Sequence, residues 1–176
     1  MMIAINPGHY IGEENYDPGA CNDSLQLREV DINVAVAQRL WALLKETTLD
    51  LVYIHKGELW EITEASNEAG ADVFVSIHCN SAANEEATGT EAFYCEGSVA
   101  GERFASVVQE EMVGLGLEDR GTKSNSLYVT RHTDAVAVLV ELGFISNAEE
   151  GARLGTEEFQ EAAAEALFRA IVKFVG

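Results

Sequence analysis

Three short apolar segments of this chain each lead into a side chain that can bind a metal ion or move a proton. The segments are residues 3–5, 73–77 and 138–140. The first leads toward His9, the second ends directly before His78, and the third ends directly before Glu141. If they are parallel strands, their carboxyl ends lie along one edge of a sheet, where open α/β folds build their sites. The pattern therefore predicts two imidazoles and a carboxylate in one crevice, and it favours a zinc hydrolase.

Predicted helices and strands alternate along most of the chain. Ile32, Val36 and Leu40 recur at the spacing of a helix with one buried face, whereas the β-branched and aromatic run 51–54 indicates a strand. We expect helices at residues 30–47, 59–69, 100–115 and from Thr156 onward, strands at 3–5, 51–54, 73–78, 90–94, 127–129 and 135–141, and loops at 81–89 and 121–126. This order predicts the α/β class, in one domain spanning residues 1–176. Three α/β/α layers would hold a mixed, mostly parallel central sheet of about six strands flanked by helices. The segments 90–94 and 127–129 could run in either direction.

The composition excludes several classes of partner. Thirty acidic and eleven basic residues give a formal charge of −19 at pH 7, so we expect no nucleic-acid partner and no attraction to an anionic membrane. No apolar stretch is long enough to span a bilayer, and no positively charged segment precedes the first apolar run. We therefore expect no signal peptide and synthesis in the cytoplasm. Cys21, Cys79 and Cys95 lack CxxC spacing, which predicts free thiols, with Cys79 as a small core residue.

A catalytic zinc site has three protein ligands, so a third ligand is needed beside His9 and His78. Glu29 is one candidate, because it stands just before the helix predicted from Val30, where the helix dipole favours a carboxylate. Asn33 lies one turn further on the same face and could orient a ligand or a substrate.

Glu141 is the other candidate for the third ligand, and it also suits a second role. It ends the most apolar run of the chain, so its carboxyl group should be partly desolvated, with a raised pKa suited to proton transfer near neutral pH. A buried carboxylate paired with an arginine is the structural alternative. His55 follows another apolar run and is a rival ligand, and His132 lies in a polar segment from which it could contact substrate.

Six segments resemble one known family, the zinc-dependent N-acetylmuramoyl-L-alanine amidases of the type-3 group, which includes bacterial cell-wall amidases and phage endolysins. Residues 71–80, ADVFVSIHCN, are similar to the family's A-D-L-F-I-S-I-H-x-N, and residues 138–147, VLVELGFISN, to its V-L-V-E-x-G-F-I-S-N. The other four segments are residues 5–9, 17–20, 28–33 and 89–91, which resemble its D-P-G-H, D-P-G-A, E-K-D-x-x-L/N and G-x-E motifs.

The resemblance implies a phosphorylase/hydrolase-like α/β fold, one Zn²⁺ ion and specific roles for four residues. His9, Glu29 and His78 would be the zinc ligands, and Glu141 the catalytic acid and base. We further expect substrate contacts from Asn33, Asn80 and His132. The chain departs from the family pattern at Asn6, where an Asp is usual, at Tyr10-Ile11, where glycines are frequent, and at His55-Lys56, where Thr-Arg is common. These departures concern the shape of the groove and the contacts around the ligands.

The expected reaction is metal-assisted hydrolysis of the amide bond between N-acetylmuramic acid and L-alanine in peptidoglycan. Zinc would polarise the carbonyl and activate water, and Glu141 would transfer the proton to the leaving amine. A zinc peptidase or amidase acting on another small amide is the alternative enzyme, and a non-catalytic wall-binding module is the alternative from another class. We expect a monomer that acts at the cell wall, either after release from the cell or as part of a longer protein.

Overall fold

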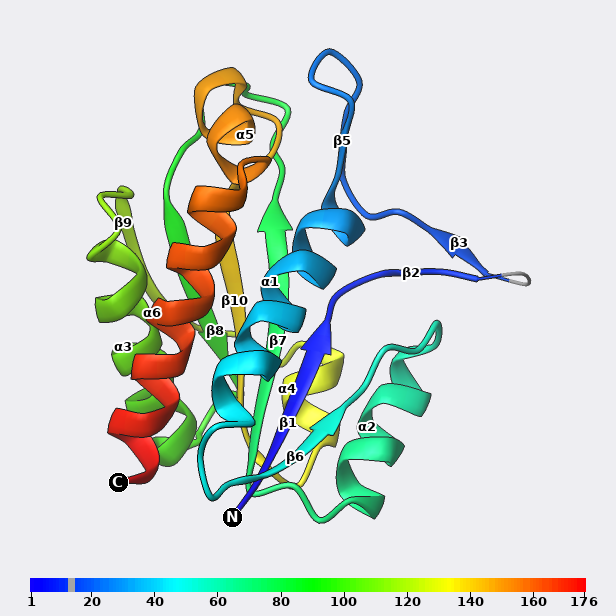
Figure 1. Cartoon of the computed structure of the whole chain (residues 1–176), viewed down its shortest axis with the longest axis vertical. Helices are drawn as coiled ribbons and strands as arrows, with labels where there is room; N and C mark the ends of the chain where they lie inside the picture. Colours follow the sequence, from blue (N-terminus) through cyan, green and yellow to red (C-terminus); the bar gives the residue numbers. More distant parts are fainter. Residues whose placement is uncertain (13–14) are drawn as a thin grey trace.

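The computed structural model describes residues 1–12 and 15–176, and its centre is a six-stranded sheet (Figure 1). The strand order is β6-β1-β7-β10-β8-β9. The strands are β1 Met2–Pro7, β6 Asp50–Tyr53, β7 Val73–Asn80, β8 Thr90–Tyr94, β9 Asp119–Ser124 and β10 Val136–Phe144. The pairs β6-β1, β1-β7 and β7-β10 are parallel, whereas β8 runs antiparallel to β10 and parallel to β9. The prediction of a mixed, mostly parallel sheet is confirmed.

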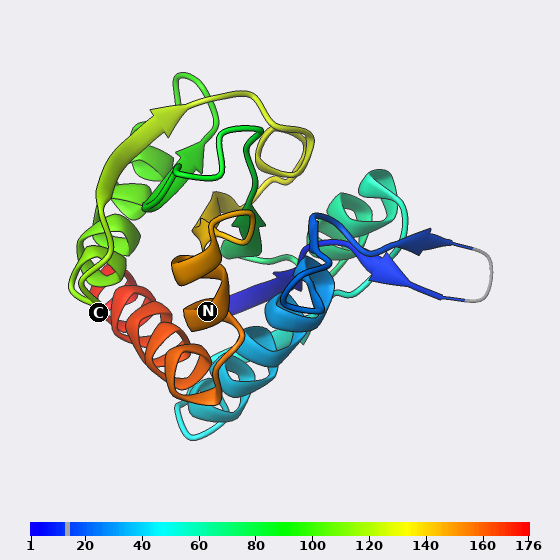
Figure 2. The same ribbon diagram turned by 90° about the horizontal axis from the view of Figure 1, so that it is seen from above.

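Helices cover both faces of this sheet, which confirms the three predicted layers. One layer contains α1 Glu29–Leu44, α3 Val99–Val113 and α6 Glu157–Val175. The opposite layer contains α2 Leu59–Glu68 and the short α4 Tyr128–His132. Viewed from above, α1, α3 and α6 lie along one side of the sheet and α2 on the other (Figure 2). A further helix, α5 Ala148–Leu154, follows β10.

The central strands β1, β7 and β10 are apolar along nearly their whole length, and both of their faces are buried. In β7, Phe74 packs with Ala4 and Leu139 on the side of α2 and α4. Val75 and Ile77 face the larger core formed with α1, α3 and α6. Continuous apolar runs of this kind are typical of parallel strands between two helical layers. They also explain why the central strands could be found from sequence alone.

Two of the predicted segments are wrong. The segment 127–129, expected to be a strand, is the start of α4, in which Val129 is buried and Leu127 packs against the same cluster. The segment 121–126, expected to be a loop, lies mostly in β9. β9 is an edge strand with a polar, half-exposed sequence, so it lacks the apolar alternation that marks a strand. Its place is set by backbone pairing with β8.

Three smaller features were not expected. The helix α5 begins where the Asn147 side chain accepts hydrogen bonds from the backbone N–H groups of Glu149 and Glu150. Two short hairpins precede α1. They are formed by β2 Tyr10–Ile11 with β3 Tyr16–Asp17, and by β4 Cys21–Asn22 with β5 Leu27–Arg28. Within the described residues, no helix combines the length and the apolar character that crossing a bilayer requires.

Candidate metal centre and catalytic groove

His9, Glu29 and His78 converge at the carboxyl edge of the sheet. His9 follows β1, His78 lies near the end of β7, and Glu29 is the first residue of α1. Glu29 lies between the two rings, with Oε2 3.1 Å from His9 Nε2 and Oε1 3.0 Å from His78 Nδ1. One ligand atom from each residue can be chosen so that all three lie within 4.8 Å of one another. These side chains therefore form a candidate metal site.

Two glycines make room for this cluster. A Cβ atom at Gly8 would lie 2.1 Å from Cε1 of His78. A Cβ atom at Gly19 would lie 2.5 Å from Glu29 Oε2 and 2.5 Å from His9 Cδ2, and the φ of +68° at Gly19 also disfavours a side chain. His9 itself has a φ of +65°, which is uncommon for a residue other than glycine. Backbone strain of this kind is found most often at functional sites.

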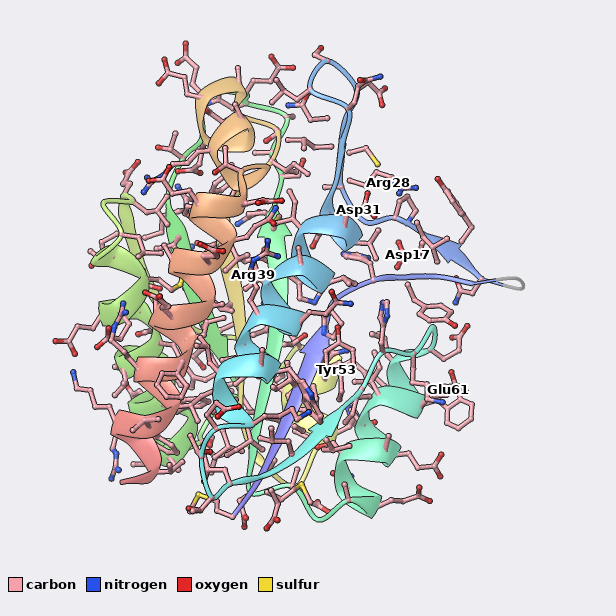
Figure 3. All side chains as sticks on the ribbon, in the orientation of Figure 1. Asp17, Arg28, Asp31, Arg39, Tyr53 and Glu61 are labelled. Atoms are coloured by element: carbon pink, nitrogen blue, oxygen red, sulfur yellow. The ribbon has the colours of Figure 1, made fainter. Side chains whose placement is uncertain are left out.

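Hydrogen bonds from neighbouring groups orient the three candidate ligands. Asp17, which Figure 3 labels beside the start of α1, places Oδ2 2.8 Å from His9 Nδ1, so that Nε2 faces Glu29. Glu29 accepts hydrogen bonds from the backbone N–H groups of Ala20 at 2.8 Å and Cys79 at 3.0 Å. Such outer contacts fix the tautomer and orientation of metal-binding side chains.

Asn33, predicted to orient a ligand or a substrate, lies beneath the cluster. It is fully buried, and its Nδ2 donates to the Gly8 carbonyl at 3.2 Å and to Glu29 Oε1 at 3.4 Å. Of the two options that its position in the sequence left open, these contacts favour orienting a ligand. Asn6, at the departure from the usual Asp, donates to the Ile54 carbonyl at 2.9 Å and accepts from the Ser76 hydroxyl at 2.8 Å, so it links neighbouring strands below the groove.

The electrostatics of these side chains favour a charged pair. Burial opposes the charge on His9, but hydrogen bonds and charge interactions with Glu29 and Asp17 outweigh it and raise the pKa of His9 to about 9. Burial likewise opposes the charge on Glu29, yet its contacts with His78 and His9 hold the pKa of its carboxyl group well below the usual range. A cation bound at the cluster would replace the proton on His9 and take its place beside Glu29.

Glu141 lies beside the cluster, on β10. It stands opposite His78 of β7 on one side and opposite Glu91 of β8 on the other. Its Oε2 is enclosed and has no hydrogen-bond partner among residues 1–12 and 15–176. Burial raises the pKa of Glu141 to about 8, with further contributions from the charges of Glu29 and Glu91. A carboxyl group with this pKa and a free oxygen is suited to accepting and donating protons near neutral pH.

The remaining candidates lie around this centre. Asn80 donates to Glu91 Oε1 at 2.6 Å and accepts from the Ser81 backbone N–H at 2.8 Å. His132 is exposed on α4, where its ring stacks on Tyr128 at a centroid distance of 4.1 Å. The rival ligand, His55, places Nε2 3.0 Å from the carbonyl oxygen of His9 and lies outside the cluster of three.

A cavity of about 210 Å³ adjoins the candidate metal site on the side of α2 and α4. Its polar lining comes from Asn6, His9, Asp17, Lys56 and His78, and the wall on the side of α2 and α4 is mostly apolar. The residues of that wall include Leu59, Ile62, Leu127, Tyr128, Val129 and Leu139. This groove opens directly onto the candidate ligands and can hold part of a substrate beside them.

The sequence pattern did not assign roles to Asp17, Glu91 or Tyr128. Asp17 lies within a quoted motif, two residues before Gly19. Its Oδ1 accepts a hydrogen bond from the backbone N–H of Gly19 at 3.1 Å. An Asp followed by Gly at this spacing is a signal for a turn, and it could have suggested a supporting role. Glu91 was also in a quoted motif, but its burial and its partners could be known only from the structure. No signal in the sequence marked Tyr128, because it lies in the segment predicted as a strand.

Comparisons with known proteins agree with this geometry. The family model described as N-acetylmuramoyl-L-alanine amidase matches residues 3–173. The uncharacterized protein YqiI of Bacillus subtilis is 37% identical, over 96% of this chain and 82% of its own length. The N-acetylmuramoyl-L-alanine amidase LytC of the same organism is 31% identical over 98% of this chain, which spans only 35% of LytC.

A solved structure shows the same fold. The crystal structure of N-acetylmuramoyl-L-alanine amidase from Clostridium difficile 630 superposes with a TM-score of 0.92 at 27% identity, and the match covers 99% of this chain and 96% of that one. The family match spans nearly the whole chain, and it includes all four residues of the candidate metal centre and its neighbouring acid. The chain therefore belongs to the N-acetylmuramoyl-L-alanine amidase family, a family of hydrolases.

Proposed function

We propose that this chain hydrolyses the amide bond between N-acetylmuramic acid and L-alanine in peptidoglycan, using one zinc ion held by His9, Glu29 and His78. The observation that carries the proposal is the convergence of these three side chains next to Glu141, a carboxylic acid with an unpartnered oxygen. Membership of the amidase family supports the identity of the substrate bond.

The donor atoms fit zinc. Two imidazole nitrogens and one carboxylate oxygen are a ligand set of catalytic zinc sites, which keep a fourth position open. Bound zinc would supply a Lewis acid for the scissile carbonyl and for the attacking water. His9 and His78 would bind as neutral imidazoles, and Asp17 and Asn33 would keep His9 and Glu29 in place.

Glu141 would carry the proton through the reaction. Its free Oε2 accepts a proton from water as the water oxygen bonds to the amide carbon, and it then donates that proton to the leaving amine nitrogen as the C–N bond breaks. Burial raises the pKa of Glu141 to about 8, and a cation bound nearby would lower it and bring the group closer to the ionised state that a base requires.

Two variants separate proton transfer from metal binding. Glu141→Gln should keep zinc, measured by elemental analysis after dialysis, and should lose release of stem peptides from purified peptidoglycan by about 10²-fold or more. His78→Ala should lose both zinc and activity. Mass spectrometry should show intact stem peptides beginning with L-alanine, because only a muramoyl amidase frees them whole from the glycan. Cleavage within the stem, or full activity of Glu141→Gln, would contradict the proposal.

A further inference from the structure

Two cations of β9 pair with Glu91, which stands opposite Glu141, and they take no part in the proposed metal chemistry. Arg120 Nε is 3.2 Å from Glu91 Oε2, and Lys123 Nζ contacts the same oxygen. The other oxygen of Glu91 accepts a hydrogen bond from Asn80 at 2.6 Å. Glu91 is only 4% exposed, and a buried carboxylate needs a partner, but one cation is enough to balance its charge.

Arg120 already meets that need. Beyond its contact with Glu91, its Nη1 donates to the Thr88 carbonyl at 3.2 Å, and its guanidinium carbon lies 4.8 Å from the centre of the Phe144 ring. Lys123 makes fewer polar contacts than Arg120. In the described part of the chain its only ion pair is with Glu91, its side chain is 39% exposed, and its ammonium group has three N–H donors. Lys123 therefore presents a positive charge and spare donors to solvent.

The register of the sheet places Lys123 on the same face as the metal site. Phe93 of β8 stands opposite Leu139 of β10, which lines the groove, and also opposite Lys123 of β9. Glu91 lies two residues before Phe93, so both side chains leave β8 on the same face, and Glu91 stands opposite Glu141. The Lys123 side chain lies against Phe93, with Nζ 5.8 Å from the ring centre, and extends to Glu91.

The two sides of the metal site thus differ in character. On the side of α2 and α4 the groove wall is mostly apolar, with Lys56 as the cationic residue of its lining. On the side of β8 and β9 there is an exposed ammonium group in a chain of formal charge −19. The peptide half of the substrate carries carboxylates, and an ammonium group attracts a carboxylate through charge-assisted hydrogen bonds.

We propose that Lys123 binds a carboxylate of the substrate's peptide, at the second residue beyond the scissile amide. This inference rests on the proposed function. Neighbouring strands are about 4.8 Å apart, so an ammonium group over β8 lies about one to two strand spacings from the column of Glu141. An extended peptide advances about 3.3–3.6 Å per residue, so the second residue past the cleaved bond reaches about 7 Å, which matches that separation.

The test uses two preparations of glycan strands that differ only at the second stem residue, glutamate with either a free or an amidated α-carboxylate. Stem-peptide release is measured as kcat and KM for the wild type, Lys123→Met and Lys123→Arg. Lys123→Met keeps most of the side-chain length, and Arg120 still pairs with Glu91. Lys45→Met, at the C-terminal end of α1, is the matched control for removing a lysine charge.

For Lys123→Met we expect KM to rise about tenfold on the free carboxylate strands, with kcat within about twofold, and to stay unchanged on the amidated strands. Lys123→Arg should retain most of the wild-type preference for strands with the free carboxylate, and Lys45→Met should retain all of it. An equal rise in KM on both preparations, or no rise on either, would overturn the role of Lys123. If the wild type releases stem peptide from neither preparation, it is the proposed function itself that fails.

Discussion

Gly8→Ala should close the metal site with a single methyl group while every proposed ligand remains in the sequence. The new Cβ atom would lie 2.1 Å from Cε1, 2.3 Å from Nε2 and 2.5 Å from Nδ1 of His78. Ordinary van der Waals contact begins at 3.4 Å, so the ring must move by about 1.3 Å. Metal–ligand distances tolerate only about 0.2 Å, so this displacement removes His78 from the cluster.

The cost to zinc binding should far exceed the cost to the fold. An imidazole ring can rotate away, and the fold then loses the 3.0 Å contact between His78 and Glu29. A hydrogen bond to a charged group contributes about 1.5–3 kcal/mol, and 1 kcal/mol shifts the Tm of a domain of this size by about 2–4 °C. We therefore expect the metal-free variant to melt about 3–12 °C lower. Loss of one of three ligands should weaken zinc binding by at least about 100-fold, since losing only an outer contact costs about 10–100-fold.

Competition with a chromogenic chelator measures the zinc affinity, and circular dichroism measures the Tm. Gly70→Ala is the control, because its φ of +63° introduces backbone strain but its new Cβ has no heavy atom within 4 Å. That variant should lose stability and keep its zinc affinity. If Gly8→Ala binds zinc as tightly as the wild type, His78 is not a ligand in this geometry and the reasoning is refuted.

Three more predictions concern the charges of the cluster. Asp17→Asn should lower zinc affinity about 10–100-fold, because His9 loses the carboxylate that lies 2.8 Å from its Nδ1. The same chelator competition measures this affinity, and an unchanged value would mean that Asp17 does not orient the ligand. Zinc binding at pH 7.5 should release about one proton from His9, whose pKa is raised to about 9, and part of another from Glu141, whose raised pKa of about 8 would fall beside the cation. Calorimetry in buffers of different ionisation enthalpy should show the release fading above pH 9, and a release independent of pH would contradict the charged pair. The metal-free protein should also lose stability in both directions of pH. The raised pKa of His9 contributes stability that is fully present below about pH 6.5 and is lost as the pH rises through about 9. The lowered pKa of Glu29 contributes stability that is present above about pH 4.5 and is lost on acidification. Urea unfolding should therefore show less stability at pH 9.5 than at pH 6, with the raised pKa of Glu141 acting in the same direction, and the same free energy at both pH values would count against the assignment.

The neighbours of Glu141 connect the proposed chemistry to the proposed binding of the peptide. On one side it meets His78, and on the other it meets Glu91, whose charge is balanced by cations of β9. In the proposed mechanism, the carboxylate that moves protons thus stands between the candidate metal site and a cationic edge of the sheet. A substrate that spans both would have its cleaved bond beside Glu141.

Much of the centre of this molecule could be predicted from the sequence. The strands that end near His9, His78 and Glu141 are buried on both faces, so nearly every residue in them is apolar, and the polar residues at their ends stand out. Because parallel strands end at the same edge, the order of the segments was enough to predict that these side chains meet. Residue spacing alone left open whether Glu29 or Glu141 completes the cluster, because it does not show where a helix begins relative to a strand end.

Only the tertiary structure decided the periphery. β9 is polar and half-exposed, so backbone pairing with β8, rather than its own composition, makes it a strand. That pairing brings Arg120 and Lys123 to Glu91, about thirty residues away along the chain. The short α4 forms one wall of the groove because Val129 packs against the sheet beside α2. A local apolar pattern determines which segments are buried, but contacts between distant segments determine which polar groups meet, and the recognition of substrate depends on those contacts.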